Sequence, residues 1–171
     1  MAAGLRYVDP SHRPGPVRRA YAALANTRPL RAFSRAVVWK LDPYVLRATR
    51  GRVGLGALLP SALLETTGAK SGEPRRNGVL YFHDRDDVII VASRQGDSRH
   101  PAWFHNLVAN PDVVLGGQPM RATVVTDEAE RERLWGLADR VFAPYASYRR
   151  EAARAGRVIP IVRLTPRYEE A

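Results

Sequence analysis

The feature that most constrains the fold is a change in hydrophobic period after Pro60. From there on, apolar residues fall into short runs separated by Gly-rich or strongly polar turns, which is typical of β-strands joined by tight connections. The polar segment HDRDD and the pair Gly116-Gly117 are both suited to hairpin turns. Strands are therefore expected at Ser61–Thr67, Arg76–His83, Val88–Ser93, Val113–Leu115, Met120–Thr126 and Val158–Leu164.

Helices are expected between some of these strands, without the regular alternation of a parallel sheet. Asp127 is a suitable N-cap, and Glu130 three residues later completes a capping-box pattern. No G-x-G-x-x-G sequence follows a strand, which argues against a nicotinamide-binding Rossmann domain. The order of elements predicts an antiparallel α+β barrel. The helices are expected at Ser98–Asn110, from Asp127 to about Phe142, and at Tyr145–Ala155.

The chain of 171 residues has room for one domain, which we divide into three parts. Residues 1–16 are rich in Pro and Gly and are expected to form a flexible tail. Residues 17–60 are expected to form a basic amphipathic helical segment, and residues 61–171 the barrel. The helical segment has an apolar face of Leu30, Phe33, Val37 and Leu41 and a basic face of Arg28, Arg31 and Arg35.

The net charge of +10 is concentrated in the first third of the chain: residues 1–60 hold 11 of the 27 basic residues but 2 of the 17 acidic ones. Such asymmetry indicates an anionic partner. An arginine face opposite an apolar stripe favours an anionic membrane surface over nucleic acid, while packing of the helix on the barrel is the alternative. Because no apolar run approaches about 18 residues and the N-terminus lacks the apolar region of a secretory signal, we expect a cytoplasmic protein. The basic helix would add peripheral contact with the inner face of the cell membrane.

Cysteine is absent from the sequence, which excludes disulfides, a thiolate nucleophile and cysteine-ligated metal centres. His100 and His105 are the obvious candidates for a metal-binding pair. Their i, i+5 spacing should splay them apart on a helix, and no carboxylate stands at ligand spacing. No metal site is therefore predicted.

Residues Thr66–Arg76, with the sequence TTGAKSGEPRR, form the densest cluster of polar and charged side chains. The strand ends in two hydroxyls, two glycines open the backbone, and Lys70, Arg75 and Arg76 surround the turn. Exposed amides with fixed cations are typical of a cradle for phosphate or for several carboxylates. A solvated hairpin turn with ordinary surface charge is the alternative.

A second cluster runs from Ser93 to Asn106, where a strand enters a Gly-containing loop and then a helix. Trp103 and Asn106 share one helix face at i, i+3 spacing. Trp103 is suited to stacking on a planar ring, and Asn106 to hydrogen bonding with it. Packing of Trp103 in the core is the alternative.

Tyr145 and Tyr148 form the third group, again at i, i+3 spacing and directly after Pro144. Their hydroxyls are suited to donating hydrogen bonds or protons in a pocket whose wall the rings would form. Packing of this helix on the barrel is the alternative.

Taken together, these stretches resemble the deazaflavin (coenzyme F-420)-dependent nitroreductase family. LLETTGAKSGEPRRNGVLYF is similar to the family's strand and T-T-G-x-K-[ST]-G-x-P-R turn, and VASRQGDSRHPAWFHNLVANPDV to its strand, loop and helix with a P-x-W-[YF]-x-N-L-x-A-N-P core. PYASY and RVIPIVRLTP resemble its tyrosine-bearing helix and closing strand. The resemblance runs from about Leu63 to Pro166 in the same order and spacing. It implies a split β-barrel related to the flavin-binding split barrels. It also implies an oxidoreductase that transfers hydride from reduced F-420 to an acceptor such as a quinone or a nitroaromatic compound.

The resemblance also implies which residues meet the coenzyme. Its phosphate and oligoglutamate tail would be bound by Lys70, Ser71, Arg75 and Arg76. The deazaflavin would be lined by Asn77, Gly78, Val79 and Leu80, with Ser93 and Arg94 close to the ring or the ribityl chain. The pocket would be completed by Ala102, Trp103, Phe104, His105 and Asn106. Tyr145 and Tyr148 would border the acceptor site, and Tyr148 would also contact the coenzyme.

The sequence departs from the family pattern at two positions. Ala69 stands where Arg is frequent, so one anion contact is lost, and Arg76 is expected to compensate. Glu151 stands where some members carry another Tyr, which leaves the acceptor pocket undefined.

The coenzyme implied by the resemblance determines the expected mechanism. A deazaflavin delivers hydride, so the protein needs neither nucleophile nor metal. The protein would hold the ring against the acceptor at about 3–3.5 Å. A hydroxyl from Ser93, Tyr145, Tyr148 or water is expected to stabilise or protonate the reduced product.

Two other interpretations stay open at this point. The first is a split-barrel oxidoreductase that uses FMN. The second is a basic module without enzymatic activity that binds anionic lipid or nucleic acid, nucleic acid being disfavoured. The sequence leaves the acceptor, the length of the coenzyme tail and the formation of a homodimer undetermined.

Overall fold

The computed structural model describes residues 5–11, 15 and 59–167. The predicted basic helical segment over 17–60 lies outside these residues apart from its last two, so its helix, its arginine face and its partner stay predictions. None of the helices in the described part of the chain is long and apolar enough to cross a bilayer.

The strands and helices predicted after Pro60 are all present in kind, with small shifts at their ends. In chain order the elements are β1 (Ser61–Thr67), β2 (Pro74–Asp84), β3 (Asp87–Val91), the short turn η2 (Arg94–Gly96), α4 (Ala102–Ala109), β4 (Asp112–Leu115), β5 (Gln118–Val124), α5 (Glu128–Val141), α6 (Tyr145–Arg154) and β6 (Ile161–Pro166).

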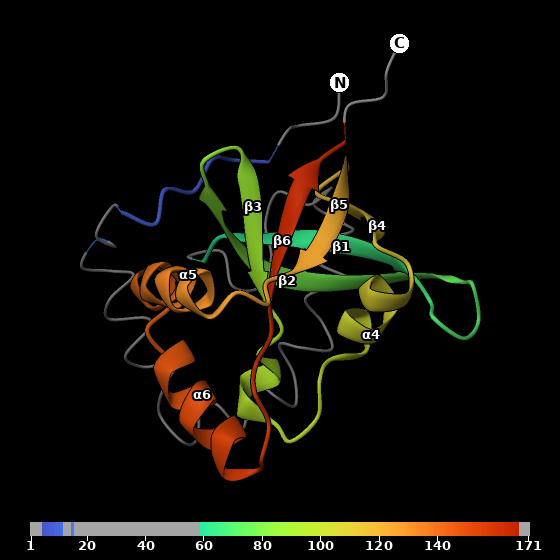
Figure 1. Ribbon diagram of the computed structural model, residues 1–171. Helices are drawn as coiled ribbons and strands as arrows, with labels where there is room; N and C mark the ends of the chain where they lie inside the picture. The colour runs from blue at the N-terminus through green and yellow to red at the C-terminus, as the bar shows by residue number, and fades with distance from the viewer. Residues whose placement is uncertain (1–4, 12–14, 16–58, 168–171) are drawn as a thin grey trace.

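The strands form a closed antiparallel barrel in the order β1-β2-β3-β6-β5-β4 (Figure 1). β1 pairs with β2 along its whole length and with β4 at Leu64 and Glu65, which closes the ring. The last strand, β6, lies between β3 and β5. This arrangement confirms the predicted α+β barrel, and it makes the C-terminal strand a requirement for closure.

Alternate side chains of the strands build two separate cores, because successive residues of a strand point to opposite faces. On β3, Val88 and Ile90 belong to the cluster inside the barrel. Ile89 and Val91 belong to a second cluster with residues of α5 and α6. In Figure 1 these two helices lie together on one side of the barrel, whereas α4 lies on another. β3 is thus buried on both faces.

The helix predicted over 98–110 begins later than expected, at Ala102. Pro101 is its N-cap and has extended backbone angles (φ −64°, ψ 149°). Proline has no N–H to donate and suits the edge of a helix. Residues 98–100 therefore belong to the loop that leads into α4.

Two predicted strand ends also shift, and both lie beside the same hydrogen bond. β3 ends at Val91 rather than Ser93, and β6 begins at Ile161 rather than Val158. The N–H of residue 92 donates to the carbonyl of Pro160 at 3.0 Å. Beyond this bond the chain turns sharply into η2 and leaves the sheet.

Residues 5–11, expected to belong to a flexible tail, lie against the barrel instead. The N–H of Val8 donates to Nδ1 of His83 at 3.0 Å, and the carbonyl of Val8 accepts from the N–H of His83 at 2.9 Å. The hydroxyl of Tyr81 donates to the carbonyl of Arg6 at 2.9 Å. Burial lowers the pKa of His83, so the imidazole is neutral and accepts the bond from Val8. These partners lie far along the sequence, so local composition did not predict them.

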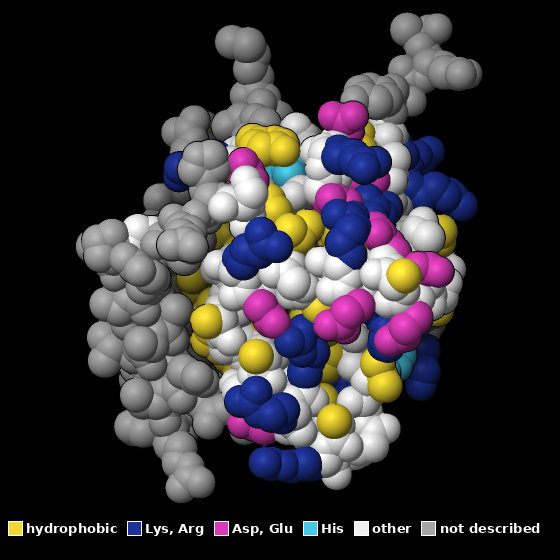
Figure 2. All heavy atoms as spheres, turned by 60° about the vertical axis from the view of Figure 1, so that its left-hand side comes forward, with side chains coloured by type: hydrophobic (Ala, Val, Ile, Leu, Met, Phe, Trp, Pro, Cys, Tyr) yellow, Lys and Arg dark blue, Asp and Glu magenta, His cyan; other side chains and the backbone are white. Residues whose placement is uncertain are grey.

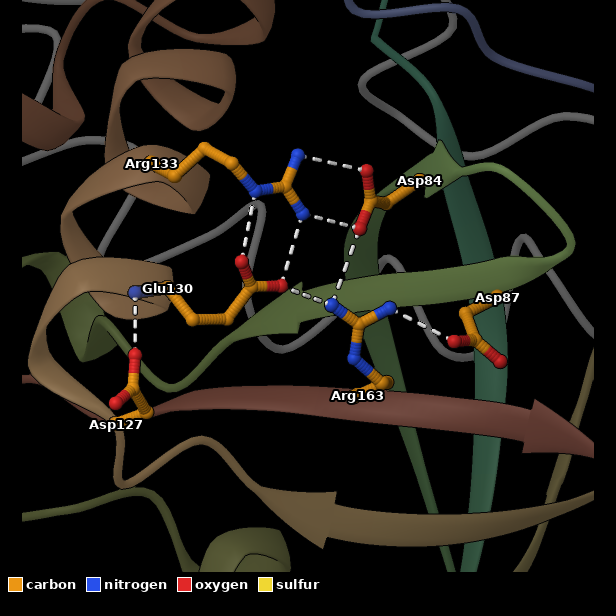
Figure 3. Close-up of polar contacts among 6 residues, drawn as sticks. All are labelled: Asp84, Asp87, Asp127, Glu130, Arg133 and Arg163. Atoms are coloured by element: carbon orange, nitrogen blue, oxygen red, sulfur yellow. Dashed lines mark hydrogen bonds and ion pairs between the residues drawn. The ribbon is translucent and has the colours of Figure 1, made fainter.

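The predicted N-cap of α5 is confirmed, but the capping box is formed only in part. Asp127 accepts the N–H of Glu130 at 2.8 Å. The Glu130 carboxylate does not return to the cap. It binds Arg133 at 2.7 Å and also Arg163 on β6 (Figure 3).

A network of ion pairs fixes α5 to the barrel wall (Figure 3). Arg133 of α5 binds both oxygens of Asp84, at 3.0 and 2.6 Å. Arg163 joins Asp84 at 3.1 Å and Asp87 at 2.7 Å. Hydrogen bonds from Arg133 and Arg163 hold the pKa of Asp84 below its ordinary value of 3.8. Charge-assisted, bidentate bonds of this kind are the stronger class of polar contact.

Replacing Asp84 with Asn should lower the free energy of unfolding by about 2–3 kcal/mol at neutral pH, because two guanidinium groups lose their shared anion. The folded-state pKa is depressed, so the contribution is present above pH 3.8 and is lost as the pH falls through the lower folded value. Urea unfolding at pH 7 and at pH 3 measures the difference.

The matched control is Asp86→Asn, because Asp86 is exposed in the same β2–β3 turn and outside the network. It should change stability by less than about 0.5 kcal/mol. Equal effects of the two substitutions would contradict a role for the network in holding α5.

Candidate functional site

The turn between β1 and β2 is compact and is built around two glycines. The N–H of Gly68 donates to the carbonyl of Glu73, and the N–H of Gly72 donates to the carbonyl of Gly68, both at 2.9 Å. A Cβ on Gly68 would lie 2.6 Å from Oγ of Ser71 and 3.2 Å from the carbonyl oxygen of Glu73, so a larger residue would displace the Ser71 side chain. Gly72 has a φ of +69°, in the left-handed region that glycine favours. The turn thereby presents the side chains of residues 69–71 outward.

Asn106 of α4 connects this turn to the barrel. Its Oδ1 accepts from the N–H of Ala69 at 3.1 Å, and its Nδ2 donates to Oγ1 of Thr66 at 3.1 Å. Trp103 and Leu107 on α4 are buried in the barrel core. One helix therefore fills the barrel and also positions the turn.

A cleft of about 840 Å³ opens between the β1–β2 turn and α4. Clefts of this size accommodate cofactors and drug-sized ligands. Its residues are Gly68, Ala69, Lys70, Ser71, Arg75, Arg76, Asn77, Ala102, His105 and Asn106. None of these lining residues is acidic, and three are permanently or normally cationic. Residues predicted for the site on the turn and on the helix therefore line the same cleft.

The three cations of the cleft have different partners. Nε of Arg76 lies 2.7 Å from a carboxylate oxygen of Glu65 on the neighbouring strand. Among the described residues, the side-chain hydrogen bond of Arg75 is to the hydroxyl of Ser71, at 3.4 Å. Lys70 has no acidic partner among the described residues. Arg76 is thus partly neutralised, which weakens the expectation that it replaces the arginine missing at Ala69.

The face on the α5 side of the molecule is charged in a different way. Figure 2, which brings this side forward, shows basic and acidic side chains interspersed. Arg131 pairs with Glu128 at 2.6 Å, and Arg133 pairs with Glu130 at 2.7 Å, each within α5. Arg131 and Arg133 of this face are thus paired with carboxylates, whereas Lys70 and Arg75 of the cleft have no acidic partner among the described residues.

Several residues predicted to meet the coenzyme lie outside the described cleft. Val79 and Trp103 are buried inside the barrel, with 7% and 3% of their surface exposed. Gly78 follows Asn77 along β2, and Leu80 packs against the core under α5 and α6. Phe104 packs at the edge of the barrel core. Trp103 therefore lies in the core, which is the alternative interpretation of this residue.

The loop that carries Ser93 and Arg94 packs on α6 through a glycine. Gly96 has a φ of +80°, and a Cβ on it would lie 3.0 Å from the carbonyl oxygen of Tyr148. Arg94 and Gln95 also have positive φ, at 45° and 54°. Non-glycine residues seldom adopt this region, so surrounding contacts must hold the loop in place. The predicted hydroxyls of Ser93 and Tyr148 thus belong to two segments in direct contact.

Tyr145 and Tyr148 are buried in the core between α5 and α6. They are 3% and 6% exposed. The ring of Tyr145 makes edge contacts with Phe142 and Trp135, and the ring of Tyr148 is tilted against Phe142. Burial raises the pKa of Tyr145 well above its ordinary value of 10.0, so this phenol stays protonated at neutral pH. Neither Tyr lines the cleft, and packing is the role that their surroundings show.

His100 and His105 approach each other more closely than expected. Their rings lie 5.9 Å apart in an edge-on arrangement. The i, i+5 argument failed because His100 lies in the loop before α4 and not on the helix. Among the described residues, no group of three acidic or imidazole side chains is placed to bind a metal ion.

Arg157 is the polar residue near the site that the sequence analysis missed. It is 7% exposed and lies between α6 and β6. Its guanidinium reaches the 92–100 loop and donates to Nδ1 of His100 at 3.0 Å. The sequence carries no signal for this role, because both neighbours of Arg157, Gly156 and Val158, are exposed and an arginine between them is expected to be exposed as well.

Comparison with known proteins identifies the family. The sequence model for the F-420H(2)-dependent quinone reductases matches residues 39–166. The chain belongs to this family. An F-420H(2)-dependent quinone reductase of Mycobacterium tuberculosis is 40% identical over 136 residues, which cover 75% of this chain and 89% of the relative. The resemblance to F-420-dependent enzymes is confirmed, whereas the nitroreductase assignment is not.

Solved structures agree with this family and with the fold. A reductase dependent on reduced F-420 matches with a TM-score of 0.54 and 35% identity, covering 61% of this chain and 93% of that one. A domain-swapped dimer matches with a TM-score of 0.55 and 32% identity, covering 71% and 96%. The split-barrel prediction is thereby confirmed.

Replacing Asn106 with Ala should lower the free energy of unfolding by about 1–2 kcal/mol, because the Ala69 amide and the buried Thr66 hydroxyl lose their partner. Amide exchange at Ala69 should accelerate, and hydrogen-exchange mass spectrometry measures both effects. Asn110→Ala is the control and should leave exchange at Ala69 unchanged, since Asn110 donates only a long hydrogen bond, of 3.4 Å, to the carbonyl of Thr67. Unchanged exchange at Ala69 in the Asn106 variant would show that the turn is held in another way.

Proposed function

We propose that the protein transfers a hydride from reduced coenzyme F-420 to a quinone. The observation that carries this proposal is the cleft beside the β1–β2 turn, where Lys70 and Arg75 have no acidic partner among the described residues. The chain also belongs to the F-420H(2)-dependent quinone reductase family. Membership supports F-420 rather than FMN as the coenzyme, so the FMN alternative is abandoned.

The residues of the cleft fit the coenzyme's anionic end. A phosphate and several carboxylates require cations and N–H donors within reach. Lys70 and Arg75 are exposed at the turn, and His105 and Asn106 form the opposite wall on α4. Since Asn106 already uses both ends of its amide, its contribution is to hold the turn in position.

Reduction of a quinone to a hydroquinone takes up one hydride and one proton. When bound, the reduced deazaflavin supplies the hydride. The chain must orient the acceptor and keep a hydrogen-bond donor near the quinone oxygen. Ser93 and Tyr148 remain the predicted donors, on the loop and the helix that meet at Gly96. Tyr145, kept protonated by burial, is suited to donating a hydrogen bond and not to acting as a base.

Three further expectations accompany this proposal. Nitroaromatic compounds are proposed as a second class of acceptor, which turnover with such compounds would test. A homodimer is supported by the domain-swapped dimer among the similar structures. A cytoplasmic location stays a prediction, as does peripheral membrane contact through residues 17–60.

Replacing Lys70 or Arg75 with Ala should weaken binding of F-420 about five- to tenfold, because each removes a charge-assisted contact to the anionic tail. The effect should shrink as salt is raised, since exposed charges are screened. Fluorescence titration of the coenzyme measures the dissociation constant.

Two controls separate tail binding from general charge. Arg140→Ala removes the same charge from α5, on another side of the barrel, and should leave the affinity unchanged (Figure 1). The deazaflavin chromophore without phosphate and glutamates should bind the wild type and the Lys70 variant equally. Tighter or equal binding of FMN by the wild type, with no turnover of a quinone by reduced F-420, would overturn the proposed function.

A further inference from the structure

Arg157 is a buried cation whose donors are directed to main-chain carbonyls and an imidazole. Nη1 of Arg157 donates to the carbonyls of Ser93 at 3.1 Å and Asp97 at 2.6 Å, and Nη2 donates to the carbonyl of Ala92. Nε donates to Nδ1 of His100 at 3.0 Å. Four acceptors spread over nine residues of the loop thus converge on one planar group.

Burial of this guanidinium costs free energy, which indicates that its contacts have a specific role. A buried guanidinium is usually paired with a carboxylate, because desolvation of a charge is otherwise poorly compensated. No carboxylate of the described residues hydrogen-bonds to Arg157, and the Asp97 carboxylate lies 3.5 Å from Arg94. Burial lowers the pKa of Arg157, and the charge of Asp97 offsets this only in part.

The loop that Arg157 holds is strained. Three consecutive residues, 94–96, have positive φ, and Gly96 is pressed against the backbone of α6 at Tyr148. Such a conformation persists only where its surroundings impose it. The carbonyls that Arg157 binds flank this strained turn on both sides, at Ser93 and at Asp97.

The bond to His100 also fixes the proton on that ring. A guanidinium cannot accept a hydrogen bond, so Nδ1 of His100 must present its lone pair. The imidazole is therefore neutral, with its proton on Nε2. Its ring lies beside that of His105, which lines the cleft.

We propose that Arg157 is a positioning residue for coenzyme binding: it holds the loop that carries Ser93 and Arg94 and keeps His100 as the neutral Nε2–H tautomer beside the cleft. This inference rests on the proposed function, in which the loop and the cleft receive F-420. Arg157 itself lines no part of the described cleft and acts through the loop and the imidazole.

The state of His100 is tested on the wild-type protein without any coenzyme. Long-range proton–nitrogen NMR should show the Nε2–H tautomer at pH 7. The groups that face this imidazole are Arg157 and His105, while Arg94 donates to the backbone carbonyl of His100. Burial and Arg157 lower the pKa of His100. Its titration should therefore lie below pH 6.5 in the wild type and move up towards 6.5 in Arg157→Met. A proton on Nδ1, or an imidazolium at pH 7, would overturn the assignment.

The positioning role is tested by the affinity for F-420. Arg157→Met should raise the dissociation constant about tenfold or more, and Arg157→Lys about threefold, because an ammonium has three donors and no planar fork. The control is Arg163→Met, which removes an equally well-bonded arginine from the network on β6 and should lower Tm without changing the affinity.

The results distinguish this inference from the proposed function. Wild-type protein that binds no F-420 would refute both. Wild-type protein that binds F-420 as tightly as a folded Arg157→Met variant would refute the positioning role alone. If Arg157→Met does not fold, the Lys variant and the wild-type tautomer decide the matter.

Discussion

The packing of α4 into the barrel is the interaction on which the site depends. Trp103 and Leu107 fill the interior that six strands enclose, and Asn106 on the same helix holds the β1–β2 turn. Residues three and four apart on a helix share a face. Core packing and the geometry of the ligand cleft are therefore set by one short helix, and neither can change without the other.

Arginine serves three different purposes in this chain. On the outer wall, Arg133 and Arg163 share carboxylates in a network that joins α5 to the barrel. At the turn, Arg75 remains exposed and free of acids among the described residues, as an anion-binding group must be. Behind the site, Arg157 binds carbonyls and an imidazole. The partners of the guanidinium, rather than the residue type, determine which role each one has.

The cleft is suited to the chemistry of its family because the protein has to do little more than position the coenzyme and the acceptor. Hydride chemistry resides in the coenzyme, so charge, shape and hydrogen-bond donors are what the chain must contribute. The cationic turn and the α4 wall would hold the anionic tail. The strained 94–96 loop meets α6 at Gly96. The predicted donor Ser93 directly precedes this loop, and the predicted donor Tyr148 is on α6. Placement of this kind requires rigid support, which Asn106 and the barrel core provide.

The sequence by itself determined the strands, the hairpins, the cap at Asp127 and the cationic turn, because periodicity and turn chemistry act between neighbouring residues. The resemblance added the coenzyme family. Tertiary structure alone decided that Trp103 fills the core, that Asn106 holds the turn, and that Arg157 locks a loop about 60 residues away. These contacts join segments far apart in the chain, and which distant partner a polar group meets depends on how the barrel closes, not on its sequence neighbours.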